Sequence, residues 1–287
     1  MKKNSAIAYH YCGVESFFNI IQNKTLWLSD SSYMNDDEEC IWVDKIIKET
    51  LRRLKENQQG VPDRNQLSIF EKTYENIQDK KHYIISFSRA KDLLSQWRGY
   101  ANDGHGIAIG FQSDLFFDIL KISSKSQGVS CVPPRDCVVT THKIGTEKII
   151  YNINSTMEMI STTLADGGNL AHTAILVKEL ASTIKHDSFA EEREIRITYT
   201  PENNLQSEPN EFIDMPLKKI SKIKYRVSSN QIIPFYEFNF SSECNSLLMP
   251  EIILGPKCKL VKNDLNAFLK HNGFESTHIT HSESPYR

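Results

Sequence analysis

The sequence predicts a single α+β domain, 1–287, with a mixed or antiparallel sheet at its core. Three observations favour this fold class. Short apolar or alternating runs, typical of strands, recur from one end of the chain to the other. Segments with helical spacing of apolar residues separate the early runs, and several strand-like runs follow one another late in the chain. The length of 287 residues and a hydrophobic content of 39% are sufficient for a substantial core.

The segment 1–111 alternates between strand-like and helix-like patterns. Residues 6–11 are rich in aromatic and branched side chains, which is typical of a strand, and Val14–Ile21 carries apolar residues on one helical face. The acidic run Asp36–Glu39 suits the positive end of a helix dipole and predicts the start of a helix. The elements expected in this part are strands at 6–11, 25–29, 82–88 and 106–111, and helices at about 14–21, 36–54, 65–77 and 93–100.

The second half of the sequence predicts a helical insertion followed by short strands. Two prolines leave 129–141 open between a loop and an edge strand. Helical patterning over about 146–184 is interrupted at Gly167-Gly168. Together with the helices expected early in the chain, this region predicts two helical insertions, at about 36–79 and 146–184. We expect these insertions to recognise a target or partner. The strands expected after them are 195–199, 211–215, 220–227 and 251–254, and a last helix covers 262–271.

Charge and composition exclude several classes of protein. The 34 basic and 36 acidic residues give a formal net charge of -2, which argues against a generic polyanion binder or a polybasic membrane-surface protein. A nucleic acid bound through a local patch remains open. No run approaches the roughly 20 apolar residues that cross a bilayer. The six cysteines lack zinc-ribbon spacing and are interpreted as reduced thiols. We therefore expect a cytoplasmic protein with no membrane partner.

His10 is the first candidate site residue. It stands between Tyr9 and Tyr11 in the first predicted strand, and strand alternation sends the two tyrosines to one face and His10 to the other. For an isolated histidine we favour a half-buried side chain bonded to a backbone carbonyl. The functional alternative is a group at a strand end that holds a ligand hydroxyl.

The segment 86–100 holds an unusual density of polar and aromatic side chains. Ser86 and Ser88 share one face of a strand, and Trp97 and Tyr100 follow on a short helix. As a structural arrangement, Ser88 caps the following turn, and the two aromatic residues pack as a helical core pair. As a functional arrangement, the serines, Gln96 and an aromatic ring line a cleft for a planar ligand.

Two acidic runs are candidates for chemistry. The run Glu191–Arg196 places three acids and two arginines ahead of a strand, where a solvated loop with loose ion pairs is the usual explanation. Glu194, however, opens the strand, and a carboxylate held there by Arg196 could stabilise a cationic transition state. The run Asp36–Glu39 invites a metal interpretation but lacks the calcium-loop pattern, so helix capping is preferred and no metal site is expected.

Taken together, these stretches resemble a bacterial family of unknown function that is often met near defence and mobile elements. The resemblance spans nearly the whole chain. It departs at Cys12, where the family usually has threonine, and at Ile195, where it has tryptophan. The matching stretches are Tyr9-His10-Tyr11, Leu26–Asp30, Asn35-Asp36 with Glu39, Ser86-Phe87-Ser88, Trp97 with Tyr100-Ala101, Gly106–Phe111, Glu192–Arg196, Ile253–Pro256 and Tyr286-Arg287.

More remotely, the order of motifs is similar to that of ADP-ribosyltransferases of the His-Tyr-Glu class. The resemblance implies that fold with inserted helices, and NAD as the substrate. It implies that His10 bonds the adenine-side ribose, that Tyr100 stacks on nicotinamide, and that Glu194 bonds the nicotinamide ribose and steadies the oxocarbenium ion. The remaining residues expected to contact NAD are Tyr11, Ser86, Ser88, Trp97 and Arg196.

The leading hypothesis is therefore an NAD-consuming ADP-ribosyltransferase-like enzyme, with a toxin or phage-defence role suggested by family context. Its acceptor would be a protein or nucleic acid, and an antitoxin or defence partner is possible. One alternative is a metal-dependent nuclease that uses Asp36, Glu39, Glu192 and Glu194, although no lysine follows at the spacing that such enzymes need. The other alternative is a non-catalytic sensor of a nucleotide or a phage protein.

Overall fold

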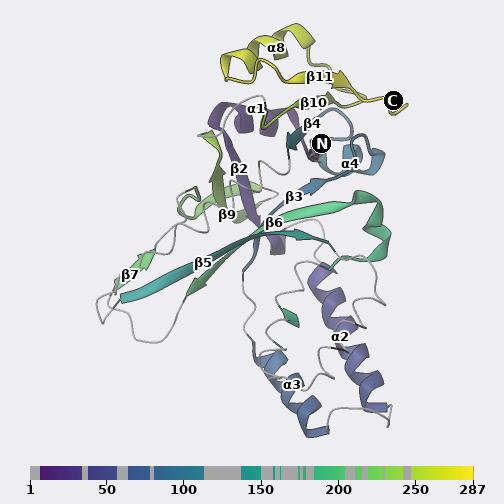
Figure 1. Cartoon of the computed structure of the whole chain (residues 1–287), viewed down its shortest axis with the longest axis vertical. Coiled ribbons are helices and arrows are strands. Elements are labelled where there is room, and N and C mark those ends of the chain that lie inside the picture. The colour runs from purple at the N-terminus through teal and green to yellow at the C-terminus, as the bar shows by residue number, and fades with distance from the viewer. Residues whose placement is uncertain are drawn as a thin grey trace, which may run out of the picture. The chain divides into compact units, whose positions relative to one another are not determined.

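The structure of the chain is a computed structural model with two compact units. It describes residues 7–33, 38–56, 64–77, 81–112, 137–149, 158, 162, 174, 177–178, 184–203, 211–214, 219–228, 230–241 and 247–286 (Figure 1). The first unit comprises 1–31, 82–147 and 192–287, and the second comprises 32–81 and 148–191. The second unit is thus drawn from the two stretches in which helical insertions were expected.

Eleven strands of the described chain form one mixed sheet in the order β11-β10-β4-β1-β3-β2-β9-β8, with β6, β5 and β7 branching from β3. The pair β10–β11 and the pair β5–β7 are parallel. The pairs along the path from β10 to β8 and the pair β3–β6 are antiparallel. The strands are β1 (Ile7–Cys12), β2 (Thr25–Asp30), β3 (Tyr83–Ser88), β4 (Ile107–Gln112), β5 (Cys137–Lys148), β6 (Glu194–Asn203), β7 (Glu211–Asp214), β8 (Lys224–Ser228), β9 (Gln231–Asn239), β10 (Glu251–Leu254) and β11 (His278–His281). The α+β class with a mixed sheet is confirmed.

The strand β3 is the branch point of this sheet. One of its edges pairs with β6 along its whole length, from Tyr83 to Ser88. Its other edge is shared, because β2 pairs at Tyr83 and Ile84 and β1 pairs at Ser88. The edge of β3 around Ser86 therefore lies where β1 and β2 diverge.

The main core lies on one face of the sheet. Alternate residues of β1, β3 and β6, such as Ala8, Phe87 and Ile197, are buried there. Helices α1 (Val14–Asn23) and α8 (Lys262–His271) contribute their apolar stripes to the same core through residues such as Phe17 and Leu269. The opposite face carries a smaller cluster, in which Tyr9 and Tyr11 of β1, Ala108 of β4 and Ile253 of β10 pack with Trp97 and Ala101 of the α4 (Leu94–Tyr100) region.

Glycines at the start of β4 permit a close approach of three segments. A Cβ on Gly106 would lie 2.2 Å from the backbone oxygen of Cys12, and one on Gly255 would lie 2.4 Å from the backbone oxygen of Gly104. Gly104 itself has a φ of 85°, which favours glycine. The glycine-rich segment 104–110 thus forms a turn into a crowded strand.

The second unit contains α2 (Glu38–Glu56) and α3 (Arg64–Asn76). The apolar stripe of α2 is inward, with Ile46, Ile47 and Leu51 buried and Leu54 packed against them. Of the helical region expected at about 146–184, most lies outside the described residues. The first three of its residues belong to β5 instead, because that strand continues to Lys148.

The strand β9 has no counterpart among the predicted elements, because Pro234 stands in its middle. Ser228 and Gln231 face each other across a two-residue turn, so the residues on either side of Pro234 pair with β8 and Pro234 occupies a non-hydrogen-bonded position. The β2–β9 register ends at Ser29 and Phe235, the residue after Pro234. The missing N–H therefore costs no ladder bond between β8 and β9. The strand predicted at 220–227 is observed as Lys224–Ser228, and Ile220 forms an isolated bridge with Phe238.

Candidate functional site

Three segments that are distant in sequence meet on adjacent strands of the sheet. In one row across the sheet, Tyr9 of β1 faces Ser88 of β3, and Ser88 faces Glu194 of β6. Two residues further along the same two strands, Ser86 of β3 faces Arg196 of β6. Directly opposed residues in an antiparallel pair share a face of the sheet, so these five side chains lie on the same face.

Glu194 and Arg196 form a buried ion pair at the start of β6. The guanidinium donates from Nε to Oε1 at 2.6 Å and from Nη2 to Oε2 at 3.1 Å. The side chain of Glu194 is 6% exposed and that of Arg196 is 4% exposed. Arg196 holds the carboxylate in a two-point geometry that a lysine could not reproduce. The expected loose ion pairs of a solvated loop are therefore wrong for this pair, which is a fixed and desolvated group.

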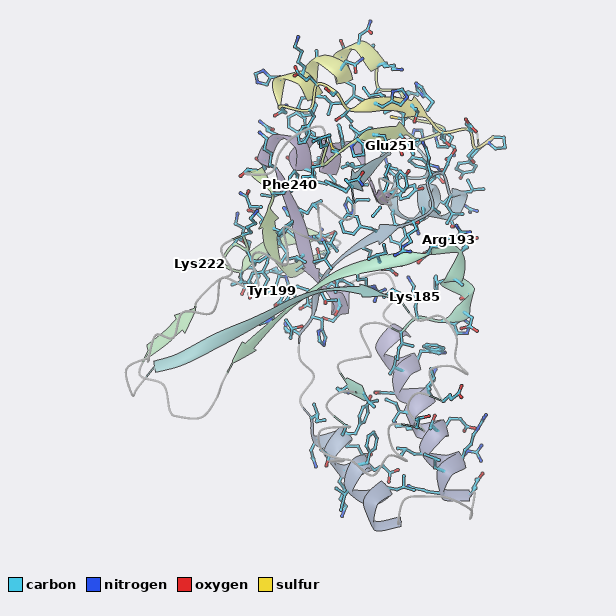
Figure 2. The ribbon with its side chains drawn as sticks, in the orientation of Figure 1. Lys185, Arg193, Tyr199, Lys222, Phe240 and Glu251 are labelled. Atoms are coloured by element: carbon cyan, nitrogen blue, oxygen red, sulfur yellow. The ribbon has the colours of Figure 1, made fainter. Side chains whose placement is uncertain are left out.

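Ser88 fastens the segment that precedes Glu194. Its hydroxyl donates to the carbonyl oxygen of Glu192 at 2.6 Å and accepts from the backbone N–H of Ala90 at 2.9 Å. Between Glu192 and Glu194, Arg193 has a φ of 46°, an uncommon conformation for a residue with a side chain (labelled in Figure 2). Such conformations cluster at functional sites, where the surrounding contacts maintain them. Nothing in the sequence marks Arg193 as a strained position.

His10 lies at the divergence of β1 and β2. Its Nδ1 is 3.1 Å from the carbonyl oxygen of Ser86, and its ring is 5.7 Å from that of Phe87 between centroids. A carbonyl oxygen only accepts, so Nδ1 carries the proton and Nε2 of the neutral ring is an acceptor. Burial lowers the pKa of His10 and favours this neutral form. The carbonyl-bonded histidine expected from the sequence is what the structure has, and Nε2 can still accept from a ligand hydroxyl.

Alternation along β1 separates His10 from the polar row. Tyr9 shares a face with Ser88 and Glu194, so His10 belongs to the opposite face with Phe87. The structure thus brings His10 next to the backbone of Ser86 and brings Glu194 next to Ser88, but on opposite faces of the sheet.

The aromatic candidates differ in exposure. Trp97 is fully buried and meets the ring of Tyr11 edge-on at 4.8 Å. Tyr11 donates its hydroxyl to the carbonyl oxygen of Ala90, and burial raises its pKa. Tyr100 is 37% exposed, so it does not form the expected core pair with Trp97.

Two aspartates fix the loops on either side of α4. Asp92 accepts hydrogen bonds from the indole N–H of Trp97, the hydroxyl of Ser282 and the backbone N–H of Glu283. Asp103 accepts from the hydroxyl of Tyr286 at 2.6 Å and from Lys257 at 2.9 Å. Residues 282–286 therefore connect both ends of the helix that carries Trp97 and Tyr100.

Glu251 forms a further polar cluster on the face of the sheet that carries Tyr9, Ser88 and Glu194. Glu251 at the start of β10 is buried, accepts from the hydroxyl of Tyr9 at 2.6 Å and bonds Lys91 at 2.7 Å. Burial and the neighbouring carboxylate raise the pKa of Tyr9. Sequence reasoning missed this cluster, since Glu251 is 242 positions from Tyr9 and neither residue lies in a charged run.

The residues of the nuclease hypothesis are only partly described by the structure. Asp36 lies outside the described residues, and so does the side chain of Glu39. Among the residues whose placement is described, no group of three histidines, cysteines, aspartates or glutamates could hold a metal ion. Likewise, no described helix combines the length and apolar character needed to cross a lipid bilayer.

Comparison with known proteins identifies one similarity. Residues 96–197 match the profile of a family described as "Protein of unknown function (DUF2971)". The matched stretch covers about a third of the chain and includes most of α4, all of β4 and β5 and the start of β6, but not His10 or Ser86. No curated protein and no solved structure matches the chain.

Proposed function

We propose that the chain is an NAD-consuming enzyme that resembles ADP-ribosyltransferases and cleaves the bond between nicotinamide and ribose. One observation carries the proposal. The fixed carboxylate of Glu194 lies beside Ser88 of β3, and Ser86 lies two residues away on the same face. The neutral imidazole of His10 lies next to the backbone carbonyl of Ser86. This arrangement combines a preorganised anion with acceptors and hydroxyls for a sugar.

Glu194 supplies the catalytic charge in this proposal. Cleavage of the glycosidic bond leaves positive charge on the ribose, and a carboxylate that is already oriented stabilises this transition state more than the ground state. Arg196 donates to both oxygens of Glu194 and so fixes the orientation of the carboxylate. Arg196 is thus a positioning residue for the carboxylate.

The other predicted contacts follow from the hydrogen-bonding capacity of each group. The hydroxyl of Ser86 has no hydrogen-bond partner among the described residues, so it is available to a ligand. His10 accepts from a ribose hydroxyl through Nε2, and Tyr100 offers an exposed ring for stacking on nicotinamide. Trp97, Tyr11 and Ser88 are buried and hold this surface in place.

The bond changes balance without a metal. The bond between the ribose carbon and the nicotinamide nitrogen breaks, and its electron pair leaves with nicotinamide, whose ring becomes neutral. An acceptor oxygen or nitrogen donates an electron pair to the same carbon and loses a proton. With water as acceptor the product is ADP-ribose, and with a protein or nucleic acid the product is a modified macromolecule.

The cellular setting belongs to the same proposal. We place the protein in the cytoplasm, where NAD is available, with a macromolecular acceptor and a role as a toxin or phage-defence effector. An antitoxin or defence partner would restrain the activity.

The test is nicotinamide release from NAD by the purified full chain. We expect release by the wild type and a loss of at least about a hundredfold in Glu194→Gln, which corresponds to roughly 2.7 kcal/mol of transition-state stabilisation. Glu237→Gln is the matched control, because Glu237 is also a strand carboxylate paired with a cation, Lys224 at 2.7 Å. Circular dichroism and thermal unfolding verify that all three proteins are folded.

The outcome also separates the alternatives. Folded wild-type protein that releases no nicotinamide, with water, protein or RNA as acceptor, would refute the proposal. Stabilisation by NAD that persists in Glu194→Gln without any release would favour a sensor. Degradation of DNA or RNA that a chelator abolishes would favour a nuclease.

A further inference from the structure

The strand β8 presents an exposed apolar strip at the end of the sheet. Tyr225 is 63% exposed and Val227 is 78% exposed, and the neighbouring Ile232 of β9 is 67% exposed. Val227 is paired with Ile232, and Tyr225 is paired with Pro234, so these side chains share one face. A cluster of this kind on a surface is typical of an interaction site.

The backbone of β8 is also available for pairing. Among the strands in the described part of the chain, β8 pairs with β9 alone. The two-residue turn between Ser228 and Gln231 makes Arg226 and Lys224 the residues that bond β9. The N–H and C=O groups of Tyr225 and Val227 therefore point away from β9, toward the open edge.

Positive charge surrounds this edge. Lys219, Lys222, Lys224 and Arg226 contribute four positive charges to the described residues 219–239, and Glu237 is the acid in that stretch. Lys224 is paired with Glu237, and the Arg226 guanidinium lies over the ring of Trp27. Lys222 is exposed (Figure 2), and its ammonium group has no carboxylate partner among the described residues.

We propose that β8 binds an extended, acidic segment of another protein, which adds to the sheet as a further strand. The open N–H and C=O groups would form the ladder, the apolar strip would receive alternate side chains, and Lys222 would meet the acidic ones. Two of the three side chains of the strip, Val227 and Ile232, are aliphatic and only Tyr225 is aromatic, which favours a peptide over a single-stranded nucleic acid, whose bases stack on successive aromatic platforms. The site is remote in sequence from the NAD residues and does not depend on the proposed activity.

The test uses the full chain and a fluorescent, end-blocked peptide in which valine and glutamate alternate. We expect saturable binding that weakens by about tenfold in Val227→Pro, which removes an outward N–H, and by a similar factor in Lys222→Glu. Lys270→Glu on α8 makes the same charge change at an exposed position away from the strand and should bind as the wild type does. Since proline could disturb β8, an unchanged melting temperature is required of each variant.

Three results would overturn the proposal. The first is no saturable binding of the acidic peptide, or equal binding of a peptide in which lysine replaces glutamate. The second is binding of a single-stranded oligonucleotide that displaces the peptide or occurs in its place. The third is self-association of the wild type that Val227→Pro abolishes, because the occupant of the edge would then be a second copy of this chain.

Discussion

The substitution Ser88→Ala tests whether the site is held together from β3. The hydroxyl of Ser88 is buried and makes two hydrogen bonds, one to the carbonyl oxygen of Glu192 and one from the N–H of Ala90. Its removal takes one hydrogen bond from the buried carbonyl of Glu192 and one from the N–H of Ala90. Glu192 is two residues before Glu194, so losing its bond to Ser88 weakens the attachment of the segment that leads into β6.

The magnitude follows from these two bonds. A buried group that loses its partner costs about 1 to 3 kcal/mol, and the partly buried N–H of Ala90 adds about 1 kcal/mol, so we expect Ser88→Ala to lower the free energy of unfolding by about 2 to 4 kcal/mol. Ser86→Ala is the matched control, because Ser86 lies on the same strand face but its hydroxyl has no partner among the described residues. That control should change stability by less than about 0.5 kcal/mol.

The assay is urea unfolding followed by tryptophan fluorescence. In a Trp42→Phe background the remaining tryptophans, Trp27 and Trp97, both belong to the first unit, so the signal reports that unit. A difference in the transition midpoint at a constant slope measures the change in stability.

Equal effects of the two serine variants would refute this reasoning. A loss below about 0.5 kcal/mol in Ser88→Ala would show that the two bonds do not hold the β6 entrance. A large loss in Ser86→Ala would show that its hydroxyl is a structural group and would remove the argument that it is available to a ligand.

Two further predictions concern the same unit. Gly106→Ala should destabilise it by more than about 3 kcal/mol, measured by urea unfolding, because the added carbon would lie 2.2 Å from the backbone oxygen of Cys12. Gly99→Ala, which meets nothing within 4 Å in α4, should be neutral or stabilising by up to about 1 kcal/mol, and the prediction fails if the two variants behave alike. The lowered pKa of His10 predicts that stability falls as the pH drops below about 6.5, because the unfolded chain then binds a proton that the native chain does not. In His10→Asn, whose amide can replace the donor to the Ser86 carbonyl, this part of the pH dependence should disappear from melting curves recorded between pH 5 and 8, and its persistence would assign it to other groups.

Much of the strand order along the chain could be predicted, because alternation and short apolar runs are local signals. The strands that carry His10 and Ser86 were expected within one residue of their observed bounds, and the strand that Glu194 opens was expected at 195–199 but continues to Asn203. The strand β9 was missed because Pro234 is a strand breaker unless its missing N–H falls at a non-hydrogen-bonded position. That position depends on the register with β8, which no local pattern contains.

In the candidate site, too, features set by neighbouring residues could be predicted, and features set by strand pairing could not. Alternation correctly separated His10 from Tyr9 and Tyr11. The cross-strand rows that place Glu194 beside Ser88 depend on which strands pair, and that is set by the whole fold. The left-handed conformation of Arg193 is imposed by its surroundings, since its residue type gives no signal for it.

The anchoring of α4 by residues 282–286 has a consequence for the route by which the chain folds. The bond from Glu283 to Asp92 spans 191 positions, and the bond from Tyr9 to Glu251 spans 242. Closing such long loops is slow, because the entropy of the intervening chain is lost before the contact contributes any stability. The face that carries the site should therefore be among the last parts to become ordered. In a hydrogen-exchange pulse during refolding, amides of the local helix α1 would gain protection before those of α4.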